Sequence, residues 1–259
     1  MGNLFDLSGR VALITGGNGG IGLGMADGLA EHGCDICIWG TKEEKNAAAL
    51  ESLKRHGTQI TALKCDVSNQ QEVESCFAET LKSHGRVDGC FANAGIGTRG
   101  TRFDDMESGE WNQVIDVNLN GVFYTFQCAA RHMRKRAEGG DAFGRLVGTA
   151  SLAAISGQAR GEHYAATKGG LISMIKALAV EYARHGVTAH TILPGWIETA
   201  MTEDSFKWDT FVERVLPRVP ARRWGQPEDF AAIAVYIMSA GSSYHTSENF
   251  LIDGGYSVF

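Results

Sequence analysis

Hydrophobic positions along the chain follow two kinds of pattern. Short, continuous apolar runs end at glycine or a small polar residue, which is typical of buried parallel strands. Longer segments between them carry apolar residues at helical spacing. The expected strands are 10–15, 35–39, 59–64, 87–92, 144–150, 187–193 and 250–252. The expected helices are 23–32, 43–55, 70–84, 108–136, 162–185 and 228–238.

This alternation of strands and helices predicts βαβ units joined by right-handed crossovers. The fold class is therefore α/β, a Rossmann-like doubly wound parallel sheet of about seven strands with helices on both faces. No linker or shift in composition interrupts the 259 residues, so we expect a single domain over residues 1–259. Ligands of such sheets bind at the carboxyl ends of the strands, where we expect the functional site.

Composition narrows the classes of function. Hydrophobic residues make up 44% and charged residues 21% of the chain, which is ordinary for a soluble globular protein. The net charge of -6 argues against a nucleic-acid surface, and no apolar run is long enough to span a membrane. The six scattered cysteines are expected to be reduced, as in a cytoplasmic protein. No H-E-x-x-H or paired C-x-x-C motif indicates a metal site.

The richest glycine cluster lies between the first expected strand and the first expected helix. It reads Thr15-Gly-Gly-Asn-Gly-Gly-Ile-Gly22. Backbone N–H groups without side chains can approach a pyrophosphate closely, and a helix N-terminus favours the negative charge. A flexible turn is the alternative interpretation, but the strand–loop–helix context favours dinucleotide binding. The loop residues expected to contact the cofactor are Gly16, Asn18, Gly20, Ile21 and Gly22.

Tyr164 and Lys168 are four residues apart and share one face of the expected helix 162–185. An ammonium about 4 Å from a phenolate stabilises it by roughly 4 kcal/mol at an effective dielectric of about 20. We therefore expect Lys168 to lower the pKa of Tyr164 towards physiological pH, which suits proton exchange with an alcohol or carbonyl oxygen. The alternative is a lysine whose stem simply packs over an aromatic ring.

Several motifs, in order along essentially the whole chain, resemble the short-chain dehydrogenase/reductase family. Thr15-Gly16-x-x-x-Gly20-Ile21-Gly22 resembles its cofactor loop, and Asn118, Ser151, Tyr164 and Lys168 resemble its catalytic tetrad. Two features depart from the family pattern: Asn93 follows Ala92 instead of a second Asn, and a polar loop at 138–144 lengthens the interval before Ser151. The further cofactor contacts that the resemblance implies are Asp66, Val67, Asn93, Ala94, Gly95, Tyr164, Lys168, Pro194, Gly195, Ile197 and Thr199.

The resemblance implies an NAD(P)-dependent oxidoreductase that transfers hydride between the nicotinamide and a secondary alcohol or ketone. Tyr164 would be the general acid/base, and Lys168 would lower its pKa and bind the nicotinamide ribose. Ser151 would hold the substrate oxygen, and Asn118 would support a water chain behind Lys168. The family also implies a homo-oligomer, which we expect to be a homotetramer because helices 108–136 and 162–185 carry excess apolar surface.

Two alternatives share this fold: a non-catalytic nucleotide-binding regulatory protein, and a dehydratase or epimerase. The presence of both Tyr164 and Lys168 disfavours the first, and the short chain with its Thr-Gly-x-x-x-Gly-x-Gly spacing disfavours the second. A serine hydrolase would need a G-x-S-x-G elbow around Ser151, and a P-loop NTPase would need a Gly-Lys pair. The chain has neither.

The choice between NAD and NADP depends on the end of the second strand. An acidic residue there would bind the ribose 2′-OH and repel a 2′-phosphate, but this chain has Gly40. Thr41 and Lys42 could bind the phosphate instead. Against NADP, Gly19 lacks the basic side chain that NADP-preferring relatives often carry. The missing acid at Gly40 and the candidate phosphate ligands Thr41 and Lys42 still lean the expectation to NADP(H), with dual use open. The expected substrate contacts are Ile155, Gln158, His163, Trp196 and a flap at 200–220.

Overall fold

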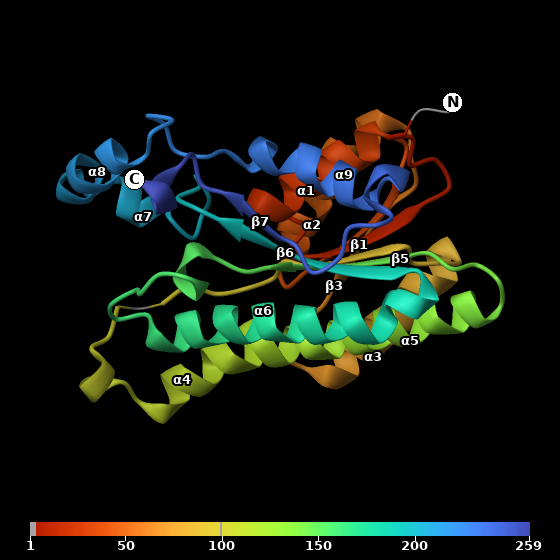
Figure 1. Ribbon diagram of the computed structural model, residues 1–259, viewed down its shortest axis with the longest axis horizontal. Helices are drawn as coiled ribbons and strands as arrows, with labels where there is room; N and C mark the ends of the chain where they lie inside the picture. Colours follow the sequence, from red (N-terminus) through yellow and green to blue (C-terminus); the bar gives the residue numbers. More distant parts are fainter. Residues whose placement is uncertain (1–3, 99) are drawn as a thin grey trace.

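The computed structural model describes residues 4–98 and 100–259 and is built on one parallel sheet. Its seven strands run in the order β3-β2-β1-β4-β5-β6-β7 (Figure 1). The order reverses between β1 and β4, which is the switch point at which such sheets bind ligands. The fold class and the number of strands predicted from the sequence are confirmed. The strands are β1 (Val11–Thr15), β2 (Asp35–Gly40), β3 (Ile60–Lys64), β4 (Gly89–Ala92), β5 (Gly144–Thr149), β6 (Val187–Pro194) and β7 (Asn249–Ile252).

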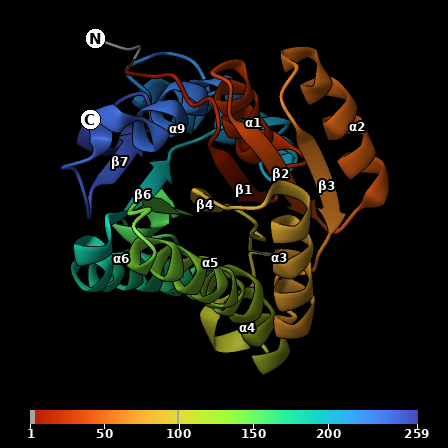
Figure 2. The ribbon, with the colours of Figure 1, turned by 90° about the vertical axis from the view of Figure 1, so that its right-hand side faces the viewer.

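Helices cover both faces of the sheet, as Figures 1 and 2 show. On one face lie α3, α4, α5 and α6, and on the other lie α1, α2 and α9. Each face has its own hydrophobic core, and every residue of β1, β4, β5 and β6 is buried. Burial on both sides explains why β1 and β4 are almost entirely apolar, whereas β5 and β6 also bury polar residues such as Arg145 and His190. The helices are α1 (Gly20–Glu31), α2 (Glu43–Leu53), α3 (Gln70–His84), α4 (Ser108–Ile115), α5 (Gly121–Glu138), α6 (Glu162–Tyr182), α7 (Glu203–Phe206), α8 (Asp209–Val215) and α9 (Ala231–Met238).

Two glycines of α1 allow the pair α1 and α9 to pack closely. A Cβ added at Gly24 would lie 2.1 Å from the carbonyl oxygen of Pro227, and one at Gly28 would lie 2.6 Å from the Cβ of Ala231. Both distances are far below van der Waals contact. The glycines of this helix therefore serve packing as well as ligand approach.

The structure differs from the sequence-based expectation in the segment 108–136. Instead of one helix, α4 and α5 are separated by a π-helical turn, Asp116–Asn120. Apolar periodicity alone did not reveal it because a π turn widens the helix by one residue without changing the composition. None of the helices in the described part of the chain has both the length and the apolarity needed to cross a membrane.

The expected flap at 200–220 contains the short helices α7 and α8. Aromatic contacts fasten this segment to the body of the protein. The rings of Phe206 and Trp224 stack with centroids 4.4 Å apart, and Phe211 lies edge-on to Trp196 at 4.9 Å. The aromatic residues that suggested a flap therefore hold the segment in place.

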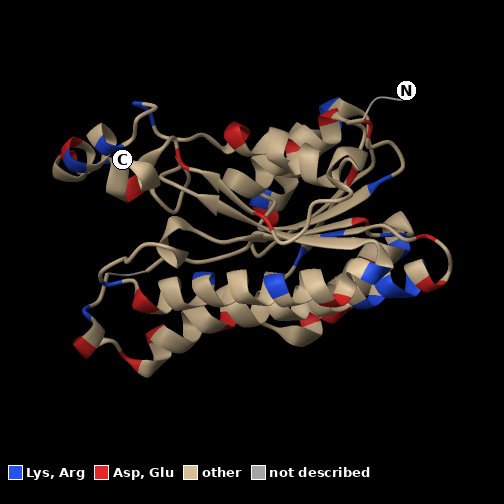
Figure 3. Ribbon diagram, viewed as in Figure 1, with Lys and Arg blue, Asp and Glu red and all other residues tan. Residues whose placement is uncertain are grey.

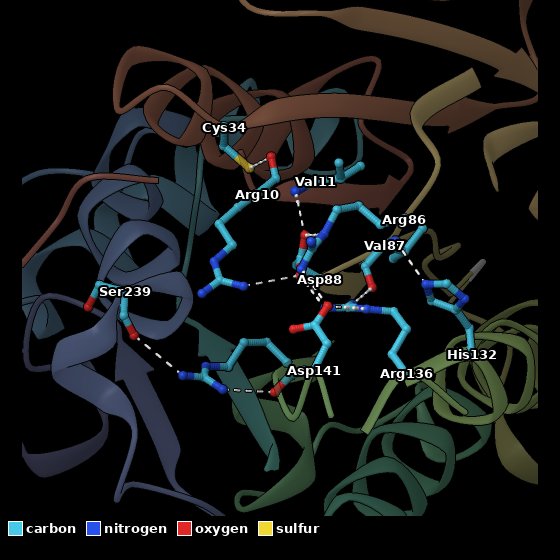
Figure 4. A network of polar contacts seen from close by, with 12 residues as sticks. Arg10, Val11, Cys34, Arg86, Val87, Asp88, His132, Arg136, Asp141 and Ser239 are labelled. Carbon is cyan, nitrogen blue, oxygen red and sulfur yellow. Dashed lines mark hydrogen bonds and ion pairs between the residues drawn. The ribbon is translucent and has the colours of Figure 1, made fainter. Parts of the chain in front are cut away.

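A buried carboxylate organises the amino-terminal edge of the sheet, away from the expected site (Figure 4). Asp88 is fully buried and accepts hydrogen bonds from the backbone of Val11 and from the side chains of Arg86 and Arg136, at 2.6–3.0 Å. Arg10 lies 3.4 Å away. Asp141, at the end of the loop after α5, joins Arg136 at 2.7 Å, in a region where Figure 3 shows Lys and Arg gathering. This network ties β1, β4 and α5 together.

Candidate active site

The loops after β1 and β4 are held together by one hydroxyl group. The Oγ1 of Thr15 accepts hydrogen bonds from the backbone N–H groups of Asn93 and Ala94, each at 3.0 Å. The Asn93 side chain donates back to the carbonyl oxygens of Thr15 and Gly16 at 3.2 and 3.3 Å. The structure thus brings the glycine loop and the expected Asn93–Gly95 loop to one place, at the switch point of the sheet.

The glycine loop has the shape that an anion-binding turn requires. A Cβ at Gly22 would lie 2.3 Å from the carbonyl oxygen of Gly16, so a side chain there would disrupt the loop. Gly20 has a φ of +50° and faces Thr199. A Cβ at Gly19 would meet no described atom within 4 Å, which leaves open space directly before α1 begins. Exposed backbone N–H groups at a helix N-terminus fit a pyrophosphate.

The end of β2 shows why this chain carries Gly40. The Asn18 side chain donates to the Asn46 side chain at 2.6 Å, and Asn46 in turn donates to the carbonyl oxygen of Gly40 at 3.0 Å. A Cβ at Gly40 would lie 2.1 Å from the Asn18 side chain. An acidic side chain therefore has no room here unless this amide pair moves. Beyond it, Thr41 and Lys42 are exposed.

The end of β3 places Asp66 and Val67 at the same edge of the sheet. The Asp66 carboxylate accepts hydrogen bonds from the backbone and hydroxyl of Ser68, at 3.0 and 2.7 Å, and stays exposed. Val67 is buried, and a Cβ at Gly121 would lie 2.8 Å from its side chain. This contact leaves Asp66 as the accessible member of the pair.

Ser151, Tyr164 and Lys168 lie together at the end of β5 and the start of α6. The hydroxyl of Ser151 accepts a hydrogen bond from the backbone N–H of Ala153 at 3.2 Å and lies near enough to Tyr164 to lower the pKa of its phenol. Lys168 is 4% exposed, and its Nζ donates to the carbonyl oxygen of Thr149 at 2.7 Å. The same Nζ lies 5.5 Å from the centroid of the Tyr164 ring. The predicted spacing on one helix face is therefore realised in three dimensions.

The electrostatics of this group differ from the sequence-based expectation. Burial raises the pKa of Tyr164, and the neighbouring Ser151 hydroxyl opposes this effect. Burial also lowers the pKa of the Lys168 ammonium to about 8. Because Lys168 points its ammonium at Thr149, it does not offset the burial of the phenol in the protein alone. The expected lowering of the Tyr164 pKa is therefore not realised in this state.

Asn118 joins the same site through the π-helical turn. Its buried amide exchanges two hydrogen bonds with the backbone of Ile96, accepting at 2.8 Å and donating at 2.9 Å. A Cβ at Gly95 would lie 3.2 Å from the Asn118 Oδ1 and 3.6 Å from the Lys168 Nζ. The four expected catalytic residues thus converge, with Asn118 and Lys168 both beside the Cβ position of Gly95.

The loop after β6 closes over the glycine loop. The backbone N–H of Gly195, next to Pro194, donates to Ile252 at 2.9 Å. Ile197 is buried and paired with Gly225, which directs the loop towards α1. The methyl group of Thr199 then lies 3.1 Å from the Cβ position of Gly20. The expected nicotinamide loop and pyrophosphate loop are therefore in contact.

Thr149 and Asn46 were not singled out from the sequence, and Thr15 was noted only as the first residue of the glycine-loop motif. Thr15 bridges two loops, Thr149 holds the Lys168 ammonium, and Asn46 fixes the end of β2. Thr15 and Thr149 end apolar runs and Asn46 interrupts a helix, so each was visible as a polar residue. Their partners are distant in sequence, and only the folded chain shows what they bind.

Comparisons with known proteins agree with this geometry. The enoyl-(acyl carrier protein) reductase family model matches residues 16–257. A 3-oxoacyl-[acyl-carrier-protein] reductase of Chlamydia pneumoniae is 37% identical over 249 residues, covering 96% of this chain and 97% of that protein. A 5-keto-D-gluconate 5-reductase of Escherichia coli (strain K12) is 33% identical over 258 residues, covering 100% of this chain and 99% of that protein.

A solved structure gives the same result. The gluconate 5-dehydrogenase of Burkholderia cenocepacia J2315, in complex with NADP and tartrate, superposes with a TM-score of 0.91 at 33% identity and 98% coverage of both chains. The family match, the sequence relatives and the superposition agree over nearly the whole length. This chain belongs to the short-chain dehydrogenase/reductase family and is an NAD(P)-dependent oxidoreductase of alcohol and carbonyl groups.

Proposed function

We propose that this enzyme interconverts a secondary alcohol and a ketone, with Tyr164 as the general acid/base. The observation that carries the proposal is that Ser151 and Tyr164 lie together, with the buried Lys168 ammonium one helical turn further along α6 and 5.5 Å from the centroid of the Tyr164 ring. A hydroxyl pair of this kind can hold a carbonyl oxygen and exchange a proton with it. The catalytic machinery and the cofactor loops would form one domain over residues 1–259.

When bound, the nicotinamide supplies or accepts the hydride. Ser151 would orient the substrate oxygen, and Tyr164 would give its proton to that oxygen in reduction or take it in oxidation. Lys168 would bind the ribose of the cofactor and favour the phenolate electrostatically. Asn118 would support proton supply to Lys168 from its place beside Gly95. The residues proposed to hold the cofactor are Gly16, Asn18, Gly20, Ile21, Gly22, Thr41, Lys42, Asp66, Val67, Asn93, Ala94, Gly95, Pro194, Gly195, Ile197 and Thr199.

For the cofactor we propose a preference for NADP(H). The amide pair Asn18–Asn46 occupies the space of an acidic side chain at Gly40, so a carboxylate that would repel a 2′-phosphate is absent from that position. Lys42 makes no ion pair with any described residue, whereas the neighbouring Glu43 is engaged by Lys64 at 3.1 Å. The relative from Burkholderia cenocepacia binds NADP, which supports the same preference.

The substrate is proposed to be a small ketone or alcohol with an apolar part. Exposed apolar side chains lie on the segments that follow Ser151 and the loop after β6: Ile155 is 56% exposed, Met201 53% and Trp208 62%. Met201 packs against the loop after β4, with its Cγ 3.3 Å from the Cβ position of Gly97. The named relatives act on a 3-oxoacyl thioester and on a keto-gluconate, so both classes belong in a substrate screen beside simple ketones.

The test of this function is a substitution that removes one oxygen atom. Tyr164→Phe should abolish turnover with any substrate that the wild type converts. In the assay, the reduced nicotinamide should then be neither consumed nor produced. Its affinity for the cofactor should remain close to that of the wild type. Tyr182→Phe, at the far end of the same helix, is the control and should be fully active. Turnover by Tyr164→Phe at a near-normal rate would refute the mechanism, and a wild type that binds cofactor but converts nothing would favour a regulatory protein.

We also propose a homotetramer in the cytoplasm. Val180 on α6 is 84% exposed and Phe123 on α5 is 46% exposed, which leaves apolar surface on neighbouring helices. The six cysteines are all free, as expected in a reducing compartment. Light scattering should report about four chains per particle, and Val180→Glu should shift that mass downward. A monomeric wild type would overturn the proposal.

A further inference from the structure

A buried pair of polar side chains next to Tyr164 lacks the hydrogen bonds that buried groups normally make. His163 is completely buried, and neither of its ring nitrogens has a hydrogen-bond partner among the described residues. The Oε1 of Glu110, on the adjacent helix α4, is also buried and without a partner there. These two groups face each other, with Nε2 and Oε1 3.7 Å apart. Buried polar groups are nearly always paired, so this gap calls for a functional explanation.

The surroundings of the pair restrict how it can move. The ring of Trp111 lies over His163 with the planes 26° apart, which holds the imidazole against α4. The other carboxylate oxygen of Glu110, Oε2, accepts a hydrogen bond from the hydroxyl of Thr101 at 2.8 Å. A rotation of the carboxylate, or a shift of α4 by less than 1 Å, would therefore bring Oε1 within hydrogen-bond distance of His163.

The pair connects the segment after β4 with the start of α6. Thr101 belongs to the connection between β4 and α4, and Gly97 of the same connection packs against Met201. The hydroxyl of Thr98 donates to the carbonyl oxygen of Arg160, at 2.6 Å, just before α6 begins. His163 directly precedes Tyr164 on that helix. The contacts Thr101–Glu110 and Glu110–His163 therefore link the segment after β4 to the residue next to Tyr164.

We propose that Glu110 and His163 are a positioning pair that sets the placement of Tyr164 at the first turn of α6. Their hydrogen bond, nearly formed in the free protein, is completed by a small rotation of the Glu110 carboxylate. His163 then donates from Nε2 to the Glu110 carboxylate, and α6 is held at its first turn. Neither residue exchanges a proton with the substrate. The inference rests on the proposed role of Tyr164 as the general acid/base.

A double-mutant cycle tests the coupling. His163→Phe keeps a ring against Trp111 but removes both nitrogens, and Glu110→Ala removes the acceptor. Each should lower kcat by roughly tenfold, with KM and cofactor affinity changed far less, because a small displacement of a reacting group reduces the rate of the chemical step. The double variant should be no slower than either single variant, since both remove the same interaction. Rate losses that multiply in the double variant would overturn the proposal.

Two further variants separate positioning from mere packing. Glu110→Gln keeps acceptor and donor capacity, so it should restore kcat to within about threefold of the wild type. Thr101→Val removes only the hydrogen bond from the Thr101 hydroxyl to the Glu110 carboxylate. It should lower kcat in the wild-type background but cause no further loss in the His163→Phe background. It also serves as the test if the buried variants fold poorly. The exposed Glu107→Ala, at the start of the same helix, is the matched control and should be unchanged.

The outcomes distinguish this inference from the proposed function. An inactive Tyr164→Phe together with a fully active His163→Phe would reject the positioning pair and leave the mechanism standing. An active Tyr164→Phe would reject the mechanism first. A positioning role acts on kcat in the folded, cofactor-saturated enzyme. If the loss of activity in His163→Phe is fully explained by a lower melting temperature or weaker cofactor binding, the positioning pair is also rejected.

Discussion

The Nζ of Lys168 donates to the carbonyl oxygen of Thr149 at 2.7 Å, inside the protein and with 4% of the residue exposed. The ammonium is thus bound to a neutral carbonyl at the end of β5, and burial lowers its pKa to about 8 from the ordinary value of 10.5. A buried charge held in this way is a cost to folding that the catalytic function requires.

Replacing Lys168 by Met should therefore abolish turnover but stabilise the fold at neutral pH. Because the folded-state pKa lies below the unfolded-state value, the penalty is fully present below pH 8 and disappears as the pH rises towards 10.5. We expect Lys168→Met to raise the free energy of unfolding by about 1–2 kcal/mol at pH 7, after the lost hydrogen bond to Thr149 is allowed for. Urea unfolding should show that the stability gained by Lys168→Met is smaller at pH 10 than at pH 7. Lys176→Met, at an exposed position of the same helix, is the control.

The NADP(H) preference should depend on Lys42. Wild-type kcat/KM should be higher with NADP(H) than with NAD(H), and Lys42→Ala should reduce that ratio by roughly tenfold, the effect of losing one charge-assisted hydrogen bond. Lys45→Ala, which removes an exposed charge from the same helix, controls for general electrostatics. A wild-type preference for NAD(H), or an unchanged ratio in Lys42→Ala, would contradict the expectation.

Gly40→Asp should not convert the enzyme to NAD(H) use by itself. The new side chain would meet the Asn18–Asn46 amide pair, with its Cβ 2.1 Å from the Asn18 side chain. We expect lower stability and weaker binding of both cofactors, measured by thermal unfolding and by nicotinamide fluorescence. The double variant Gly40→Asp with Asn18→Gly should recover part of the stability and favour NAD(H). Full activity of Gly40→Asp alone would show that the amide pair moves freely.

Two helical glycines should respond in opposite ways to the same substitution. Gly24→Ala places a methyl group 2.1 Å from the Pro227 carbonyl oxygen, and it should cost about 1–3 kcal/mol because α1 must move away from the turn that precedes α9. Gly169→Ala meets no described atom within 4 Å and should stabilise α6 by about 0.5–1 kcal/mol. Thermal unfolding of both variants would reveal the difference, and equal shifts would contradict the proposed packing.

The buried carboxylate at the amino-terminal edge should matter far more for stability than an exposed one. Asp88→Asn should reduce the free energy of unfolding by about 3 kcal/mol, because it leaves several arginines around an uncharged group. Glu51→Gln, which removes an exposed carboxylate paired with Lys54, should change it by less than about 0.5 kcal/mol. Chemical denaturation measures both changes in the free energy of unfolding. Similar losses in the two variants would contradict the expected role of the buried Asp88.

The sequence by itself determined the fold class, the succession of strands and helices along the chain, and the spacing of Tyr164 and Lys168. Buried strands such as β1 are continuously apolar, and the Tyr164–Lys168 spacing places both residues on one helix face in any α-helix. These are local properties, so they can be read from neighbouring residues alone. The resemblance to a known family then supplied the expected cofactor contacts.

Only the tertiary structure decided how those residues interact. Asn118 lies in a π-helical turn and Lys168 points at Thr149, and neither fact follows from helical periodicity. The Asn18–Asn46 pair and the Glu110–His163 pair each join residues that are far apart in the chain. Hydrogen bonding and burial at such points depend on how elements pack against one another, and one-dimensional patterns do not contain that information.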